Sequence, residues 1–204
     1  MGNTKDIRKG RGRPKSVERG QAVERATDLY WREGCHTLSL NEVCQRISIS
    51  KPALYREFGG EDGLVEAVLA HYRDIVVNPV LEFLTAEQPF AETLEALIVG
   101  MTAPRPFPPG CLFTEMRMIR QQLGAQSLTL LEEMEAERRD AFARWYARAI
   151  DKGEVNASIT SDEAGQFIDA QFTLIVLHMG MERDAKSVQF EARLALSGLT
   201  QRSV

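Results

Sequence analysis

The chain has 204 residues, of which 44% are hydrophobic and 26% are charged, so its composition is that of a globular protein and excludes a disordered one. Its apolar runs are far shorter than the roughly 20 residues of a membrane helix, and the basic, polar N-terminus lacks the apolar stretch of a secretory signal. The 3 cysteines are too few and too scattered for a disulfide framework, so we expect a soluble, cytoplasmic protein.

The net charge of −4 hides a separation of charge along the chain. Residues 1–60 contain 12 basic and 7 acidic side chains, whereas the remaining residues contain 13 and 22. Half of those 12 basic residues lie within residues 1–15, which we expect to form a flexible arm. A basic arm on an acidic body is typical of a protein that meets a polyanion at one end, although a solubilising tail has the same composition.

The first element predicted after the arm is a helix. Ala22, Ala26, Leu29 and Tyr30 recur at helical spacing, and Gly34 provides a stop. The same spacing recurs along the rest of the chain, and no long segment alternates apolar and polar residues as a half-buried strand does. We therefore expect an all-α protein.

Two short helices follow, joined by a very short turn. Ser39 and Glu42 have the spacing of a capping box, which starts the first of them. Ser50 is a suitable N-cap for the second, which ends at Gly59. This pattern indicates a helix-turn-helix, and we expect it to belong to an N-terminal domain of residues 16–61.

Longer helices are predicted for the remainder, residues 62–204, which we expect to form a C-terminal domain. A proline-rich loop over residues 102–110 interrupts them, and Thr160 and Glu163 have the spacing of a second capping box. We expect these helices over about 62–84 (bent at Asn78-Pro79), 89–101, 111–123, 126–152, 161–181 and 187–199.

The helix that begins after Ser50 carries the sharpest functional signal. On a helical wheel Leu54 and Phe58 face the core. The other positions are small, polar or cationic and are expected to face outward: Lys51, Pro52, Ala53, Tyr55 and Arg56. Small residues allow close approach to base edges in the major groove, and the polar ones suit phosphate contacts. The alternative is an ordinary helical hairpin with a solvated face.

The arm contains a second signal of the same kind. Its segment Gly10 to Lys15 resembles the core of an AT-hook, in which glycine lets the backbone enter the minor groove of DNA. Arginine is attracted there by the negative potential of a narrow groove. We therefore expect Arg11, Arg13 and Lys15 to contact the minor groove beside the helix-turn-helix.

Residues 17–70 resemble the N-terminal signature of the TetR family of bacterial transcriptional regulators. The resemblance is carried by Ala26 through Tyr30, Glu33-Gly34, Val43, Ile49-Ser50-Lys51, Leu54-Tyr55 and Phe58. It implies a homodimer, most often a repressor, that binds a palindromic operator in double-stranded DNA and releases it when a small-molecule effector enters the C-terminal domain. It also implies phosphate contacts by Ser39, Ser50, Lys51 and Tyr55, and base-facing positions for Pro52, Ala53 and Arg56.

Two positions depart from the pattern of that family. The turn commonly has a glycine where this chain has Ser48, so a non-glycine residue is expected to adopt a strained turn conformation. The next helix often starts with a lysine that contacts phosphate, whereas this chain has Glu61 and Asp62. Their negative charge opposes phosphate binding at that helix end.

The last two predicted helices favour a dimer. Residues 167–181 are apolar on nearly all sides, and Asp169 is their only acidic residue. Such a helix has to be buried on all sides, which a chain of this size does not easily arrange alone. A central core helix in a monomer is the alternative. We expect the dimer interface to include Phe167, Leu174, Leu177, Met181, Phe190 and Leu194.

The C-terminal domain is also the expected site of the effector. Large apolar and sulfur-containing side chains at helical spacing are candidates for its lining, although plain core packing explains the same pattern. The candidates are Met101, Phe107, Cys111, Phe113, Met116, Trp145, Tyr146 and Phe172.

Cys111 supports a more specific hypothesis. It opens a helix, whose dipole lowers the pKa of a thiol, and Arg105 and Arg117 are close in sequence. A thiolate at this position could sense electrophiles or oxidants and release DNA. The alternative is a small buried residue at a tight loop-helix junction.

No motif indicates an enzyme. The sequence has no glycine-rich phosphate loop, zinc motif or serine nucleophile elbow, and a thiol enzyme that uses Cys111 with His178 has no local signature. The three histidines are dispersed, so we expect no metal and no cofactor. An architectural DNA-binding protein, or a regulator whose C-terminal domain only dimerises, remains a further alternative.

Overall fold

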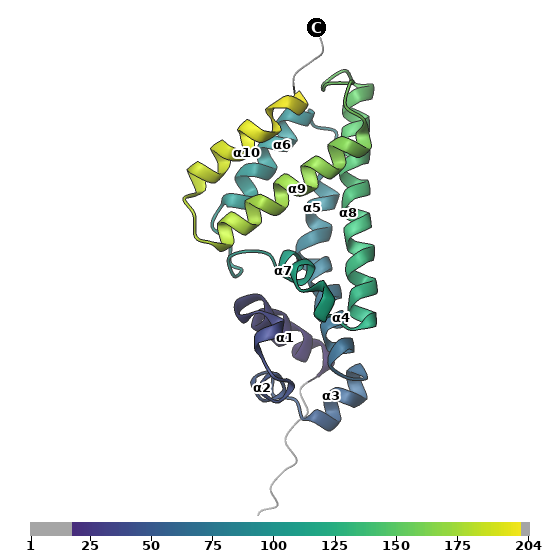
Figure 1. Ribbon diagram of the computed structural model, residues 1–204, viewed down its shortest axis with the longest axis vertical. Helices are drawn as coiled ribbons and strands as arrows, with labels where there is room; N and C mark the ends of the chain where they lie inside the picture. Colours follow the sequence, from purple (N-terminus) through teal and green to yellow (C-terminus); the bar gives the residue numbers. More distant parts are fainter. Residues whose placement is uncertain (1–17, 201–204) are drawn as a thin grey trace, which may run out of the picture.

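The computed structural model describes residues 18–200, and each regular element in that range is a helix, which confirms the all-α prediction. The molecule is elongated, with helices α1 to α3 at one end and α6, α9 and α10 toward the other (Figure 1). The long helix α8 runs along one side. None of the helices in the described range is both long and apolar enough to span a membrane.

The first three helices are α1 (Arg19–Glu33), α2 (Leu40–Arg46) and α3 (Lys51–Phe58), and a short 3-10 turn, η1 (Cys35–Thr37), follows α1. The capping box is confirmed, because the Glu42 amide donates to Ser39 Oγ and the Ser39 amide donates to the Glu42 carboxylate. Ser48 has a φ of 62°, so the turn does hold a non-glycine residue in the left-handed region, as predicted. Helix α3 ends where Gly59 takes up a φ of 77°.

The predicted helix over 62–84 is divided in three: α4 (Glu61–Tyr72), a π-helical turn η2 (Arg73–Val77) and α5 (Asn78–Phe83). The distortion lies just before Pro79, which has no N–H for the carbonyl of the preceding turn and whose ring pushes that carbonyl aside. At the other end α4 lies tightly against α3, since a Cβ on Gly63 would lie 1.8 Å from the carbonyl oxygen of Phe58.

The remaining helices are α6 (Phe90–Thr102), α7 (Leu112–Met118), the 3-10 turn η3 (Arg120–Gln122), α8 (Ala125–Asp151), α9 (Ser161–Gly180) and α10 (Ala185–Thr200). The second capping box, at Thr160 and Glu163, is confirmed. The single helix predicted over 111–123 is wrong beyond Met118. At Ile119 the backbone leaves the helical region (φ −104°, ψ 17°), and η3 turns the chain into α8.

The buried side chains form two apolar clusters. One joins α1 to α4 with α7 and the first half of α8. The other joins α6, the second half of α8, α9 and α10. Because α8 contributes to both clusters, it connects the two ends of the molecule. The core around the helix-turn-helix also extends past Gly60 into α4, α7 and α8.

Candidate nucleic-acid interface and ligand cavity

Helix α3 buries one face and exposes the other. Leu54 and Phe58 are buried as predicted, whereas the outward orientation predicted for Ala53 is wrong, because only 7% of it is exposed. Ala53 stands at the edge of the buried arc, and its short side chain is covered by neighbouring elements that a helical wheel does not represent. The exposed residues Lys51, Pro52, Tyr55 and Arg56 make up what we call the α3 outer face.

The side chains of the α3 outer face are exposed, and one of them, Arg56, has an ion-pair partner. Tyr55 is 56% exposed, and its ring packs against no other aromatic ring of the described residues. Arg56 forms an ion pair with Glu57, its neighbour in sequence, at 2.7 Å. Both side chains of that pair reach solvent, and exposed pairs contribute less than about 1 kcal/mol. Arg56 can therefore exchange Glu57 for another partner at little cost.

The serines predicted to contact phosphate act as helix caps. Ser50 Oγ accepts a hydrogen bond from the Ala53 amide at 3.3 Å, and Ser39 Oγ donates to Glu42 at 2.6 Å. Both serines are exposed at the starts of α3 and α2. The hydrogen bonds from Ser39 lower the pKa of Glu42, which keeps the cap in its charged form. The phosphate contacts of these serines stay a prediction.

The two acidic residues that start α4 lie in different environments. Glu61 is exposed, whereas the Asp62 carboxylate accepts hydrogen bonds from the amides of Gln126 (2.9 Å) and Ser127 (3.0 Å) and from Ser127 Oγ (2.5 Å). Burial acts to raise the pKa of Asp62, but these hydrogen bonds outweigh it and hold the pKa below its usual value. Asp62 therefore caps α8 and ties the start of α4 to it.

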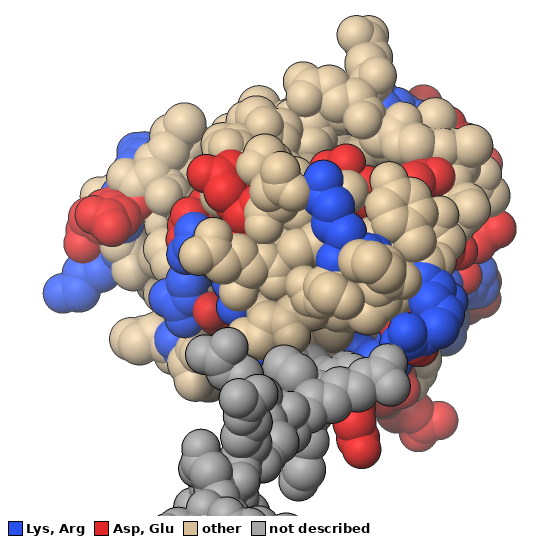
Figure 2. Space-filling model, turned by 90° about the horizontal axis from the view of Figure 1, so that it is seen from below, with Lys and Arg blue, Asp and Glu red and all other residues tan. Residues whose placement is uncertain are grey.

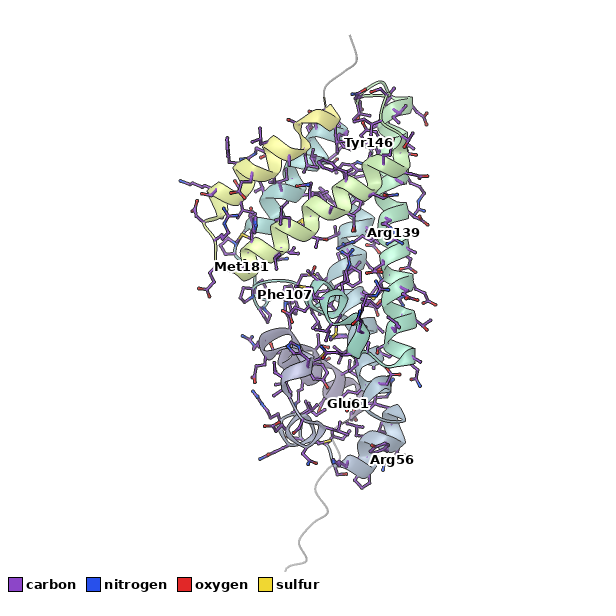
Figure 3. All side chains as sticks on the ribbon, in the orientation of Figure 1. Arg56, Glu61, Phe107, Arg139, Tyr146 and Met181 are labelled. Atoms are coloured by element: carbon purple, nitrogen blue, oxygen red, sulfur yellow. The ribbon has the colours of Figure 1, made fainter. Side chains whose placement is uncertain are left out.

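Figure 2 views the molecule from the helix-turn-helix end. Lys and Arg side chains lie on both sides of a largely uncharged centre, and acidic side chains lie mainly toward the margins of this view. Arg56 projects from this end of the molecule (Figure 3). Arg11, Arg13 and Lys15, which are predicted to contact the minor groove, lie outside the described residues.

Helices α9 and α10 present an apolar surface to solvent. Phe190 and Leu194 on α10 are each 65% exposed, and Met181 after α9 is 64% exposed. The opposite side of α9 is buried through Ile168 and Ile175. The surface, here called the α9–α10 face, comprises the six residues predicted for a dimer interface, of which Leu177 is half-buried and the others are exposed: Phe167, Leu174, Leu177, Met181, Phe190 and Leu194.

An inner cavity of about 70 Å³ lies between the C-terminal end of α4, η2, α5 and the helices α7, α8 and α9. Among the residues predicted to line a pocket, Met101, Cys111, Phe113 and Phe172 line this cavity. The others do not. Its polar lining residues are Tyr72, Arg105, Cys111 and Arg138.

The predicted lining residues outside the inner cavity have other partners. Phe107 stacks on Trp31 with ring centroids 5.4 Å apart, at the junction between α1 and the C-terminal helices (Figure 3). Met116 is buried beside Cys35. Trp145 and Tyr146 pack on Phe90 in the second apolar cluster. Met116, Trp145 and Tyr146 therefore serve as core residues in this conformation, whereas Phe107 is 42% exposed.

Cys111 lies at the N-cap of α7, and its Sγ accepts a hydrogen bond from the Tyr72 hydroxyl at 3.1 Å. Arg105 lines the inner cavity with it. The expectation that Arg117 assists Cys111 is wrong, because Arg117 donates to Glu135 at 2.9 Å and to Thr173 at 3.0 Å. Cys111 also lines a surface groove between α1 and the end of α9.

Sequence reasoning did not identify Tyr72 and Arg138. Burial is the main cause that raises the pKa of Tyr72 well above its usual value; Cys111 adds to the increase, and Arg105 and Arg138 oppose it. The Tyr72 hydroxyl is therefore a neutral donor. Arg138 is part of a long charged helix, and only its spacing from Phe142, one turn later on α8, could have suggested a shared inward face.

Residues 22–68 match the family described as bacterial regulatory proteins, tetR family. The chain is 38% identical over 72 residues to the HTH-type transcriptional repressor ComR of Escherichia coli (strain K12), which covers 35% of this chain and 34% of the relative. It is 30% identical over 91 residues to the HTH-type transcriptional activator FasR of Mycolicibacterium smegmatis (strain ATCC 700084 / mc(2)155), which covers 45% and 42%. The chain thus spans less than half the length of these curated relatives.

Solved structures extend the likeness in fold beyond this N-terminal region. Reduced NemR of E. coli superposes with a TM-score of 0.78 over 91% of this chain and 98% of its own, at 12% identity. A cysteine mutant of the TetR family transcriptional regulator CifR, complexed with a 26bp double-strand operator DNA, gives a TM-score of 0.73 over 92% of this chain and 100% of its own, at 24% identity. The N-terminal region therefore matches the tetR family of bacterial regulatory proteins, and the fold of the chain is similar to that of these solved regulators.

Proposed function

We propose that this protein is a DNA-binding transcriptional regulator that holds its operator through the α3 outer face. The observation that carries this proposal is the combination of a fully packed helix-turn-helix with an outer face rich in hydrogen-bond donors, on the domain that matches the tetR family. Core packing fixes the direction in which Lys51, Tyr55 and Arg56 project, which sequence-specific recognition requires.

The residues of this surface divide into two roles. Lys51, Tyr55 and Ser50 surround the N-terminal half of α3 and suit phosphate contacts, which fix register. Pro52 presents a small side chain toward base edges, and Arg56 reads a base once it leaves Glu57. Because Ala53 is buried, we assign it to packing and not to base contact.

We infer that the regulator acts as a homodimer joined through the α9–α10 face. Phe190 and Leu194 gain most from such a contact because two thirds of each side chain is exposed in the single chain. A two-fold axis through this face presents two copies of α3 to DNA, and two-fold symmetry in the protein requires a palindromic operator. The identity to the repressor ComR and the ability of such a dimer to occlude DNA favour repression.

A small-molecule effector in the inner cavity would control DNA binding through Tyr72. The Tyr72 ring meets Trp31 of α1 edge to face at 4.8 Å, and Trp31 also stacks on Phe107 of the proline-rich loop. A ligand that displaces Tyr72 thereby changes how α1 packs against α4. That change rotates α3 relative to its copy in the dimer and weakens the operator complex.

Cys111 supports a second candidate, a regulator that responds to thiol-reactive compounds. The observation in its favour is that Cys111 lines both the surface groove and the inner cavity, so a reagent can reach it from solvent. Alkylation joins the Cys111 sulfur to a carbon of the electrophile, and the thiol proton leaves to solvent. If Cys111→Ser leaves the response to electrophiles unchanged, this second candidate is rejected.

A mobility-shift titration on DNA flanking the coding region tests the proposed function. The expected result is a sequence-specific complex that survives excess nonspecific DNA and weakens as salt rises. Equal affinity for flanking and unrelated DNA of the same length would contradict an operator-binding regulator, and no complex at low salt would remove DNA binding altogether.

A further inference from the structure

The charges around the inner cavity are of one sign. Among the described residues that line it, the charged side chains are Arg105 and Arg138, and its remaining lining is mostly apolar. Arg138 also lies over the Phe113 ring at 4.8 Å. An apolar cavity that contains only cationic charge favours an anion, because burying a cation without a counter-charge is costly.

Arg138 is already compensated from behind the cavity. Its Nε lies 2.5 Å from Oδ1 of Asp169, and its side chain is only 12% exposed. Arg117 pairs with Glu135 and Asp169 in the same network, and Arg120 joins it through Glu135 and Glu132, so three arginines meet three acids there. This network is neutral as a whole and needs no additional anion.

Arg105 is the lining cation that lies outside this network. It belongs to the proline-rich loop between α6 and α7, it is half-buried, and no ion pair forms between it and another residue of the range 18–200. The neutral Tyr72 hydroxyl in the same lining is a hydrogen-bond donor that now donates to Cys111. A carboxylate between Arg105 and Tyr72 would receive a charge-assisted hydrogen bond and a neutral one.

The dimensions of the cavity limit the rest of the ligand. The cavity is partly open, and its volume of about 70 Å³ is about five times the minimum that one water requires, which gives room for a ligand of about five or six non-hydrogen atoms. Gly110, Cys111 and Val176 line both the inner cavity and the surface groove, which marks the route of entry. The valines of η2 and α5 and the side chains of Phe142 and Phe172 surround the part that is not charged.

We propose that the inner cavity binds a short-chain monocarboxylate, whose carboxylate pairs with Arg105 and whose alkyl chain lies against the apolar wall. This proposal rests on the proposed function, since it names the chemical class of the effector. A neutral molecule of the same shape forgoes the ion pair, and a cation meets like charge from both arginines.

The test uses butyrate labelled with ¹³C at the carboxyl carbon, titrated by NMR against the full chain without DNA. Butyramide serves as the neutral isostere and butylammonium as the cation. We expect butyrate to bind at least about tenfold more tightly than butyramide, which corresponds to about 1.4 kcal/mol, and butylammonium to bind more weakly still. Equal binding of butyrate and butyramide, or no binding of butyrate, would overturn the proposal.

Two variants locate the site. Arg105→Gln removes the uncompensated charge from a loop and should weaken butyrate binding about tenfold with little effect on butyramide. Arg139→Gln is the matched control, because Arg139 is exposed on α8 next to Arg138 in sequence (Figure 3). If both variants lower the affinity equally, butyrate binds by general charge attraction and the proposed site is wrong.

The operator titration on the same preparations distinguishes failure of this ligand proposal from failure of the proposed function, a DNA-binding regulator. Intact operator binding without butyrate binding overturns the ligand class alone. Butyrate binding that depends on Arg105, in a protein that binds no operator, upholds the cavity assignment and contradicts the regulator.

Discussion

The two ends of this molecule expose opposite kinds of surface. At the helix-turn-helix end, α3 turns its apolar side chains inward and presents Lys51, Tyr55 and Arg56 to solvent. At the other end, α9 and α10 leave Phe190 and Leu194 largely exposed although their opposite sides are already buried. A polar end whose outer face carries Lys51 and Arg56 and an apolar end are suited to different partners, the first to a polyanion and the second to another copy of the chain.

The two ends also differ in how their structure is encoded. The helix-turn-helix is delimited by local signals, such as the Ser39–Glu42 capping box and the left-handed Gly59, which act between residues close in sequence. The inner cavity is assembled from residues as distant in sequence as Tyr72 and Val176. The polar end depends on contacts between sequence neighbours, and the rest of the molecule depends on contacts between distant segments. We therefore expect mutations at the two ends to change different properties of the protein.

The largest effect is expected where the polar end is packed most tightly. Gly63→Ala places a Cβ against the Phe58 carbonyl, 1.8 Å away, so backbone must move and α4 must separate from α3. We expect a loss of about 3 kcal/mol or more in the free energy of unfolding, measured by urea denaturation. Gly100→Ala on α6 is the control, because a Cβ there meets nothing within 4 Å. Equal stability of the two variants would show that the α3–α4 contact yields easily.

The next effect tests the apolar end. Phe190→Asp with Leu194→Glu places two charges on the α9–α10 face without touching a buried residue. We expect monomers in sedimentation velocity, unchanged helicity, and operator affinity about 100-fold lower because the two half-sites are no longer bound together. A double variant that stays dimeric with wild-type affinity would refute the role given to this face.

A smaller effect is expected for Asp62, which connects the two ends. Asp62→Ala removes the cap of α8 and should cost about 1–2 kcal/mol in the free energy of unfolding. Asp140→Ala, an exposed position on α8, is the control and should be near neutral.

The same residue gives a pH dependence of known sign. The folded-state pKa of Asp62 is lowered, so its contribution is present above the unfolded pKa of about 4 and is lost as the pH falls through the folded pKa. Asp62→Asn should therefore flatten the decline of stability below about pH 4. An acid limb identical to that of wild type would show that the carboxylate is not held by Gln126 and Ser127.

Sequence reasoning succeeded where the cause lay within one turn of helix. Both capping boxes and the helix-turn-helix were predictable because the interacting groups are neighbours in sequence. The strained Ser48 was predicted from the resemblance to a family whose turn commonly has a glycine there. The burial of Ala53 was not predictable, because a helical wheel does not include the elements that cover the edge of α3.

Contacts between distant segments could not be predicted in this way. Asp62 was interpreted as an obstacle to phosphate binding, yet it caps a helix that begins 63 residues later at Ala125. Trp145 and Tyr146 were expected to line a pocket because they are large and apolar, but which of two clusters a helix face enters depends on the three-dimensional path of the chain. The cation Arg105 gained its significance only when the structure paired Arg117 and Arg138 with acids.

The central claim is that the α3 outer face reads operator DNA, and fluorescence anisotropy with Arg56→Ala and Lys51→Ala tests it most directly. Arg56→Ala should relax the preference at one operator position by about 1–3 kcal/mol, whereas Lys51→Ala should weaken all sequences alike and reduce the salt slope by about one. Arg139→Ala, on the side of α8, should change neither quantity. If Arg56→Ala and Lys51→Ala both retain wild-type affinity, sequence preference and salt dependence, this face does not contact the operator and the account is wrong.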